Sequence, residues 1–451
     1  MMANPLSDDE AFSKMFSSRF LIIPKNHPGG SNSSALDSSP KNHPGGSNSS
    51  ALDSSSQQLF KKNKSSQLPS KSATFIAENE ELLSQILIKL PPKPLLRFQC
   101  VSKAWLSLIS KPDFRRCWSA IRRNSGTVSL LFCPMGIKDI GILSLGSEGV
   151  VSPPALFNSN PLKGFIKDEV DIYIHGCNGV WCIQPGEDFD RISFRGDFDL
   201  MSIVVCNPTT GQHRKILIPH GTDWPKVRYS NIAFDPQKSD HYKLVCWVTD
   251  RMGYHRFMVY SSESAKWRVT DDHLGNKSRI DFDYFCENGI FWNGDLYFIG
   301  RGESDEISVI CFDVEHEIRP SVPQIPSIGS DISYFGEAGG DLCIVSLNNS
   351  ESFTEFDVFA LIRDHSEWAL KYRFDVAPLI ATYPDMERLE FCISSLIVRG
   401  ERAMVIISLA GKVVSCDISS MMVDELVEFE GKFENYIWNN VFQHVESLAL
   451  V

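Results

Sequence analysis

The hydrophobic positions of the chain follow two different periods in two different regions. Between residues 80 and 120, apolar side chains recur every three or four residues, which is the spacing of one face of an α-helix. From residue 127 onward, short runs of β-branched and aromatic residues bounded by turn residues indicate β-strands. Residues 1–74 contain few apolar residues and are rich in Ser, Asn, Pro, Gly and Lys, a composition that predicts disorder. The pattern predicts a disordered segment at 1–74, a small helical module at 75–123 and an all-β domain at 124–451.

The helical module divides into four short helices at prolines and capping residues. We expect a helix cap at the start of the first, third and fourth helices, because a short polar side chain can accept a hydrogen bond from a free amide of the first turn. A proline ends the first helix and another begins the second, where its fixed φ is favourable and no amide donor is missed. The residues that mark these boundaries are Asn79, Pro91-Pro92, Pro94, Ser102, Lys111-Pro112 and Asp113.

The module carries more apolar surface than it can bury by itself. A unit of about forty residues is too small to cover so many Leu, Ile, Phe and Trp side chains. Each side chain that becomes fully buried contributes about 1.5–3 kcal/mol. We therefore expect a partner for one face of the module, either the rest of this chain or another protein.

The β-rich region repeats a unit in which a strand, a polar turn and a second strand follow one another. The units recur about every 45–55 residues, a spacing typical of propeller blades with four strands, and the region holds about six or seven of them. A pair of β-sandwiches is the structural alternative. The predicted strands are Val128–Cys133, Asp171–Ile174, Ile203–Cys206, Lys243–Val248, Phe257–Tyr260, Ile290–Trp292, Leu296–Ile299, Ile307–Phe312, Leu342–Val345, Phe356–Leu361, Ala403–Ser408 and Lys412–Cys416.

An exact tandem repeat lies within the segment predicted to be disordered. Sixteen residues, from Pro24 to Ser39, occur again without change from Pro40 to Ser55. This period is too short and too polar for a solenoid repeat, and we expect a slack linker.

Cysteine spacing and apolar run lengths favour a cytosolic or nuclear protein. The twelve cysteines are scattered singly, with no Cys-x-x-Cys pair and no zinc-finger spacing, so we expect buried, reduced thiols and no metal. No apolar run has the roughly 18–20 residues that cross a bilayer, and the first residues do not resemble a secretory signal.

Charge is distributed unevenly and argues against nucleic acid as a partner. The net charge is -12, but residues 124–451 hold 27 Lys and Arg against 47 Asp and Glu. A strongly acidic domain repels a phosphate backbone, and basic partners are mildly favoured.

The sequence contains no recognisable catalytic motif. It lacks a phosphate-binding loop, a nucleophile elbow and a His-Glu-x-x-His metal motif. Two acidic pieces, Glu187–Asp190 and Asp281–Asp283, are interpreted as solvated faces. We predict no catalytic residue, no metal and no cofactor.

The helical stretch resembles an F-box, the module that binds the Skp-type adaptor of cullin-RING ubiquitin ligases. The similarity runs from Leu82 to Phe114 and includes Leu-Leu-x-x-Ile-Leu-x-x-Leu-Pro, Leu-Leu-Arg-Phe and Cys-Val-Ser-Lys-x-Trp in the order of the family. Glu78-Asn79 stand where the family usually has Leu-Pro. The resemblance implies that the adaptor contacts Leu82, Leu83, Ile86, Leu87, Leu90, Pro91, Leu95, Leu96, Val101 and Trp105.

The β-rich region resembles the kelch-like, F-box-associated propeller of plant F-box proteins. The residues that carry the similarity are Gly176–Cys182, Asn207–Gly211, Phe234–Pro236, Asp240–Lys243, Asn288–Trp292 and His444–Leu448. Together the two resemblances imply a non-catalytic substrate receptor of an SCF-type ubiquitin ligase, in which the propeller holds a target protein. A binding or scaffold protein outside any ligase is one alternative, and an enzyme built on the propeller is a second.

Overall fold

The structure is a computed structural model in which the described residues form two compact units. The first unit ends at Leu83 and the second runs from Ser84 to the end of the chain. The structure describes residues 71–124, 128–132, 141–146, 149–150, 172–185, 202–219, 224–250, 255–270, 288–301, 307–325, 332–348, 354–361, 367–383, 386, 391–429 and 441–451. The predicted disorder and the tandem repeat before residue 71 lie outside these residues.

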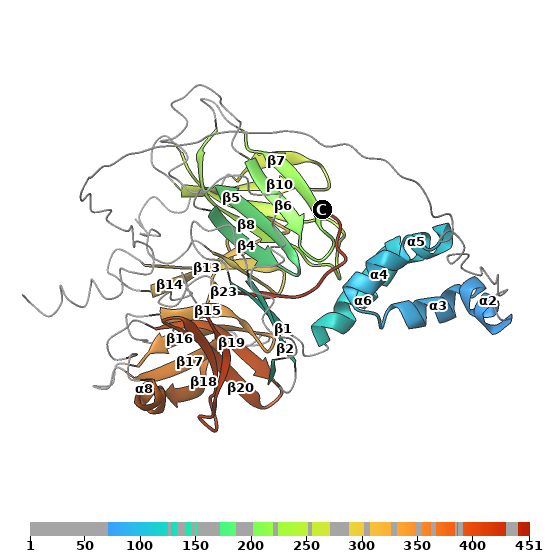
Figure 1. The fold of residues 1–451 in the computed structure, drawn as a ribbon. Helices are drawn as coiled ribbons and strands as arrows, with labels where there is room; N and C mark the ends of the chain where they lie inside the picture. The colour runs from blue at the N-terminus through green and yellow to red at the C-terminus, as the bar shows by residue number, and fades with distance from the viewer. Residues whose placement is uncertain are drawn as a thin grey trace, which may run out of the picture. The chain divides into compact units, whose positions relative to one another are not determined.

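Five helices follow one another in the helical region (Figure 1). They are α2 (Lys71–Glu78), α3 (Glu80–Leu87), α4 (Pro92–Phe98), α5 (Lys103–Ser110) and α6 (Pro112–Asn124). The predicted caps of α3 and α5 are confirmed, because Leu82 N donates to Asn79 Oδ1 at 3.0 Å and Trp105 N donates to Ser102 Oγ at 3.2 Å. The hydrophobic pattern did not predict α2.

Two predicted helix starts are wrong by one or two residues, and proline explains both. Helix α4 begins at Pro92 instead of Pro94, since two prolines can share a first turn whose amides have no acceptor within the helix. Helix α6 begins at Pro112, so Asp113 lies inside the first turn and does not cap it. The Asp113 carboxylate lies 3.3 Å from Arg116 Nη1.

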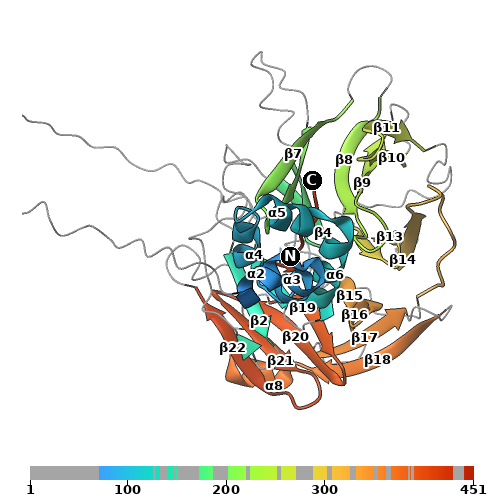
Figure 2. The same ribbon diagram turned by 90° about the vertical axis from the view of Figure 1, so that its right-hand side faces the viewer.

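The β-rich region is a propeller of six antiparallel sheets, here called blades 1 to 6 (Figures 1 and 2). Blade 1 holds β1 (Val128–Phe132), β2 (Gly141–Gly146), β3 (Gly149–Val150) and β23 (Val441–His444); blade 2 holds β4 (Ile172–Cys177), β5 (Val180–Pro185), β6 (Ser202–Asn207) and β7 (Gln212–Leu217). Blade 3 holds β8 (Lys226–Ala233), β9 (Lys243–Thr249), β10 (His255–Ser261) and β11 (Lys266–Val269); blade 4 holds β12 (Ile290–Trp292), β13 (Asp295–Arg301) and β14 (Ile307–Asp313). Blade 5 holds β15 (Ile332–Ala338), β16 (Asp341–Leu347), β17 (Glu355–Leu361) and β18 (Trp368–Asp375), and blade 6 holds β19 (Cys392–Arg399), β20 (Arg402–Leu409), β21 (Lys412–Asp417) and β22 (Val423–Glu428). One short helix, α8 (Ala377–Thr382), connects blades 5 and 6.

The blade count and the predicted strands are confirmed. All twelve predicted runs fall on strands, with end points within a few residues of the prediction. Six blades agree with the expected six or seven, and the β-sandwich alternative is excluded.

The core lies between successive blades. One cluster joins blades 3, 4 and 5 around Phe257, Phe298 and Phe312. Other clusters join blades 5 and 6, blades 2 and 3, and blades 6 and 1. Each sheet therefore buries both faces, and this explains why its strands are near-continuous apolar runs.

The ring closes through the last strand of the chain. Strand β23 pairs antiparallel with β1, and Ser129 lies opposite His444. The residues after β23 continue to blade 2, where the Asn207 side chain donates to the backbone oxygens of Ser447 at 3.0 Å and Ala449 at 2.9 Å. Strands from both ends of the β region thus complete the sheet of blade 1, and the residues after β23 tie it to blade 2.

The predicted strand–turn–strand unit has a recurring geometry in four blades. In each, the fifth residue of the turn has positive φ and its amide donates to the backbone oxygen of the first, at 2.8–2.9 Å. The side chain of the first residue accepts further hydrogen bonds from amides inside the turn. The four turns are Asn207–Gly211, Ser261–Ala265, Asp313–Glu317 and Asp417–Met421.

Candidate functional site

The ten residues predicted to contact an adaptor differ in their exposure. Leu83, Leu87 and Leu95 are buried, and Leu87 and Leu95 keep at most 1% of their surface exposed. Leu82, Leu90, Leu96 and Trp105 are half-buried, whereas Ile86, Pro91 and Val101 are exposed. The structure thus gives the buried leucines a packing role, and contact of any of the ten with an adaptor stays a prediction.

Within the second unit, the buried side chains show why the helices keep their geometry. Trp118 is fully buried on α6, and its indole Nε1 donates to the backbone oxygen of Leu90 at 3.0 Å. This bond fixes the segment that joins α3 to α4. Phe98 and Trp105 meet edge to face, with ring centroids 5.3 Å apart, and join α4 to α5.

Exposed apolar residues on these helices suit a protein partner. Ile86 is 47% exposed and Val101 is 58% exposed. Leu106 and Ile121 are also exposed, and the sequence analysis did not select them. Helical spacing marks both residues as apolar positions of the module. Spacing alone does not show which apolar residues are exposed and which are buried.

The stretch from the middle of α3 to the start of α6 is positively charged. From Ser84 to Lys111 there are five basic residues and no Asp or Glu: Lys89, Lys93, Arg97, Lys103 and Lys111. An acidic partner surface complements this stretch.

In the propeller, one buried histidine on β4 of blade 2 links β8 of blade 3 to the residue before β12 of blade 4. His175 Nδ1 accepts the amide of Ile232 at 2.9 Å, so the proton is on Nε2, which lies 2.6 Å from the backbone oxygen of Gly289. The Gly289 amide in turn donates to Asn231 Oδ1 at 2.7 Å. Burial lowers the pKa of His175 to about 4, so the ring is neutral and serves as a structural link.

The cysteines are not a metal or redox centre among the described residues. Eight of the ten described cysteines are buried, and burial raises the pKa of Cys177, Cys206 and Cys246 to about 12. Cys100 and Cys117 are exposed, so the expectation that all thiols are buried is wrong for these two; Cys100 lies in the turn after α4, and Cys117 lies on α6. Cys133 and Cys286 lie outside the described residues.

No described group of acids, cysteines and histidines has the arrangement of a metal site. The acidic pieces Glu187–Asp190 and Asp281–Asp283 lie outside the described residues. Among the helices that the structure describes, none has the length and apolar character needed to span a membrane. The tryptophans of the propeller strands serve chiefly as core anchors: Trp181, Trp247, Trp292 and Trp368 are buried, and Trp267 is half-buried and donates to the backbone oxygen of Leu217 at 2.9 Å.

Comparison with known proteins assigns both regions. The model of the F-box domain matches residues 66–117, and that of the F-box associated beta propeller domain matches residues 197–449. The chain belongs to the F-box proteins with an F-box-associated propeller. The F-box match covers α2 to α5 and the first part of α6, and the propeller match runs from β6 in blade 2 to the end of the ring.

Two plant relatives agree with this assignment. F-box protein At5g07610 of Arabidopsis thaliana is 30% identical over 71% of this chain and 75% of its own length. F-box protein At2g15640 of the same plant is 26% identical over 52% of this chain and 58% of its own length. A chain in a crystal structure of a nidogen/laminin complex is 13% identical, covers 71% of this chain and 100% of its own length, and has a TM-score of 0.38.

Proposed function

We propose that this chain is the substrate-recognition subunit of an SCF-type cullin-RING ubiquitin ligase. The F-box would bind a Skp-type adaptor, and the propeller would hold a target protein for ubiquitination. The observation that carries the proposal is the joint occurrence, in one chain, of an F-box with exposed apolar residues and an F-box-associated propeller.

In this function the chain supplies position and no reaction chemistry. Holding the target near a conjugating enzyme raises the effective concentration of its lysines. We propose that the chain needs no cofactor for this task and acts in the cytoplasm or the nucleus, where buried reduced thiols are stable.

The adaptor interface is tested with exposed side chains, because a change of a buried leucine would unfold the module. Ile86→Asp combined with Val101→Asp places two charges on the surface without removing core volume. Purified full-length chain should bind a Skp-type adaptor, and the double variant should bind about 100-fold more weakly. Calorimetric titration of the adaptor gives both affinities.

The matched control is Leu217→Asp, an apolar-to-acid change at a residue 51% exposed on β7 of the propeller. This variant should bind the adaptor as the unaltered chain does. Because the stretch from Ser84 to Lys111 is basic, affinity should also fall as salt is raised from low to physiological concentration. An unchanged affinity of the double variant would contradict the assignment of Ile86 and Val101 to the adaptor interface, and no binding by a folded chain at micromolar concentration would contradict the ligase proposal.

A second candidate function is a scaffold that works outside a ligase. It is favoured by Glu78 and Asn79, which stand where the family usually has Leu-Pro. In the structure Glu78 ends α2 and Asn79 caps α3, so both positions serve local helix geometry. If the folded chain does not bind the adaptor, the scaffold function replaces the ligase function.

A further inference from the structure

Blade 4 ends one strand earlier than its neighbours. Blades 2, 3, 5 and 6 each have four strands, whereas the sheet of blade 4 ends at β14. Strand β14, the third strand of blade 4, is therefore the outer edge of its sheet, whereas the third strand of the other blades pairs with a fourth. Among the described residues, no strand lies beyond it.

After β14 the chain forms one antiparallel bridge to this strand and then stops pairing with it. After the turn Asp313–Glu317, Ile318 makes a single bridge to Asp313. Pro320 and Pro323 follow, and each lacks the amide that a ladder requires. The segment instead turns to blade 5, where the Trp368 indole Nε1 donates to the backbone oxygen of Pro323 at 3.2 Å.

The backbone of β14 presents alternate donors and acceptors to this edge. Both polar backbone groups of Asp313 point away from β13, since its amide donates to Ile318 and its oxygen accepts from Glu317, each at 2.9 Å. The pairing of β13 with β14 has no register shift. By the two-residue alternation of an antiparallel strand, the amides and oxygens of Ile307, Val309 and Cys311 face the same side.

The side chains of β14 differ from those of the other outer strands. Strands β7, β11, β18 and β22 each carry two or three charged residues, the usual protection of an edge against pairing, and β3 has only two residues. Strand β14 has one charged residue, Asp313, at its last position. Ile307, Val309 and Ile310 are half-buried and pack against the core of blades 3 to 5, whereas Ile318 beside the edge is 54% exposed.

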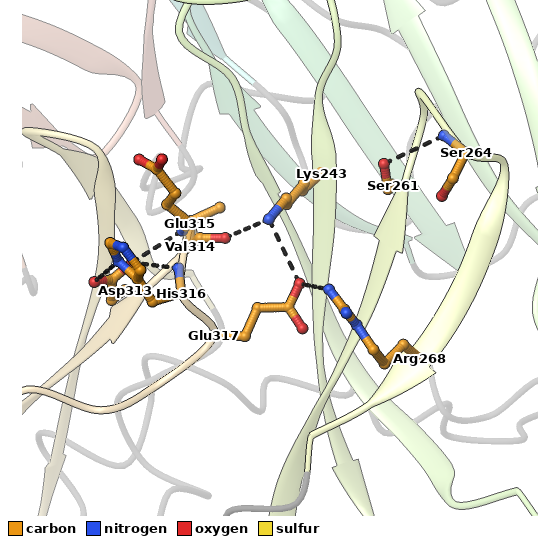
Figure 3. Close-up of polar contacts among 9 residues, drawn as sticks. All are labelled: Lys243, Ser261, Ser264, Arg268, Asp313, Val314, Glu315, His316 and Glu317. Atoms are coloured by element: carbon orange, nitrogen blue, oxygen red, sulfur yellow. Dashed lines mark hydrogen bonds and ion pairs between the residues drawn. The ribbon is translucent and has the colours of Figure 1, made fainter.

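The end of this edge is held firmly in place (Figure 3). Lys243 of β9 donates to the backbone oxygen of Val314 at 2.6 Å and lies 3.5 Å from the carboxylate of Glu317. Arg268 of β11 pairs with the same carboxylate. Asp313 accepts the amides of Glu315 and His316, so the turn is fixed before any ligand arrives.

We propose that the free edge of β14 binds an extended segment of the target protein as a fourth strand. This inference rests on the proposed function of the chain as a substrate receptor. An extended polypeptide matches the alternating donors and acceptors, and apolar side chains at alternate positions match the half-buried isoleucines and valine of β14 and the exposed Ile318. Basic flanking residues in the segment complement the propeller region, which has 47 acidic against 27 basic residues, and the exposed Glu315 at the end of the edge.

The test uses full-length chain and a matched pair of variants at one position. A displayed library of random short peptides is selected on the unaltered chain, and the affinity of the selected peptides is measured by fluorescence polarisation. Val309→Pro removes the edge-facing amide, and proline is tolerated at an edge where that amide faces solvent. Val309→Thr keeps the amide and the β-branched shape.

The selected peptides should alternate apolar residues and carry Lys or Arg. They should slow amide exchange at residues 307–311, bind Val309→Pro at least about tenfold more weakly, and bind Val309→Thr with little change. Peptides that bind Val309→Pro as tightly as the unaltered chain, or that protect other strands only, would overturn the inference. A chain that dimerises in sedimentation unless Val309 is proline would also overturn it, because a second copy would then occupy the edge.

Adaptor binding by the same preparations separates this inference from the proposed function. A chain that binds the adaptor but shows no edge-dependent peptide retains its function and loses this inference. A chain that binds edge-dependent peptides but no adaptor retains the edge and loses the ligase function.

Discussion

At the scale of single residues, two buried histidines have their protonation fixed by their hydrogen bonds. His175 Nδ1 accepts a backbone amide, and His444 Nδ1 accepts the indole Nε1–H of Trp181 at 3.0 Å. A proton added to either Nδ1 would face a donor. Burial lowers the pKa of both rings to about 4.

These two residues predict a loss of stability in mild acid. The folded pKa lies below the unfolded value of about 6.5, so the unfolded chain takes up protons first as the pH falls. The stability that the neutral rings contribute is complete above about pH 6.5 and is lost as the pH falls toward 4, by up to about 3 kcal/mol for each ring. Urea unfolding followed across this range measures the loss.

His444→Gln separates this effect from the titration of carboxylates. The amide oxygen of glutamine can accept the Trp181 bond and does not titrate. The variant should therefore lose less stability than the unaltered chain between pH 6.5 and 4.5. Equal losses in the two proteins would show that His444 does not contribute.

At the scale of elements, the repeated turn accounts for the unit seen in the sequence. Its fifth position has positive φ, and the four blades place Gly211, Ala265, Glu317 and Met421 there. A residue with a side chain is strained in this conformation by about 1–2 kcal/mol. The turn chemistry is thus shared, although only one blade uses glycine.

Two reciprocal substitutions test this strain. Ala265→Gly should raise the free energy of unfolding by about 0.5–1 kcal/mol, because Ala265 is exposed and loses little packing. Gly211→Ala should lower it by about 1 kcal/mol, since an added methyl at Gly211 meets no atom within 4 Å and only the φ angle is affected. Thermal unfolding measures both, and changes of the same sign would contradict the prediction.

Three innermost strands are among those that the list of predicted strands omits. Strands β8, β15 and β19 each contain a register shift against the next strand. A bulge breaks the two-residue alternation on which strand prediction depends. Buried polar residues such as Asn231 and Ser395 also interrupt the apolar runs of β8 and β19.

The candidate adaptor surface could be located from sequence but not divided into inner and outer residues. Leu87 and Ile86 are neighbours of similar character, yet one is buried and the other is 47% exposed. In a helix with apolar residues on two faces, periodicity does not indicate which face packs against the rest of the chain and which faces outward. The family motif marks the residues, and only tertiary packing assigns them.

At the scale of the whole propeller, the closing strand depends on one glycine of blade 2. Gly179 has φ of +82°, and a Cβ atom there would overlap Ser447 Cβ and the backbone oxygen of Val445. The glycine thus permits the segment after β23 to lie against the turn between β4 and β5. The motif Gly176–Gly179 noted in the sequence has this contact as its physical reason.

Gly179→Ala should weaken the closure by about 2 kcal/mol or more, because strain in φ and overlap with the tail add. Gly211→Ala is the matched control, since it makes the same change at positive φ with no neighbour. Denaturant unfolding should show the larger loss for Gly179→Ala, with faster amide exchange at residues 445–449. Equal losses would mean that the tail contact is easily displaced.

The pairing of β1 with β23 also sets an order for biosynthesis. A ribosome delivers β1 before the strands of the other five sheets and β23 after them, so blade 1 lacks its inner strand while those sheets can already form. During that interval the nascent chain presents an apolar edge, with Leu130 and Leu131, that becomes fully buried only when β23 has been made. A molecule proposed to mark other proteins for destruction thus passes through a stage in which it exposes an unpaired apolar strand, the kind of surface that chaperones bind.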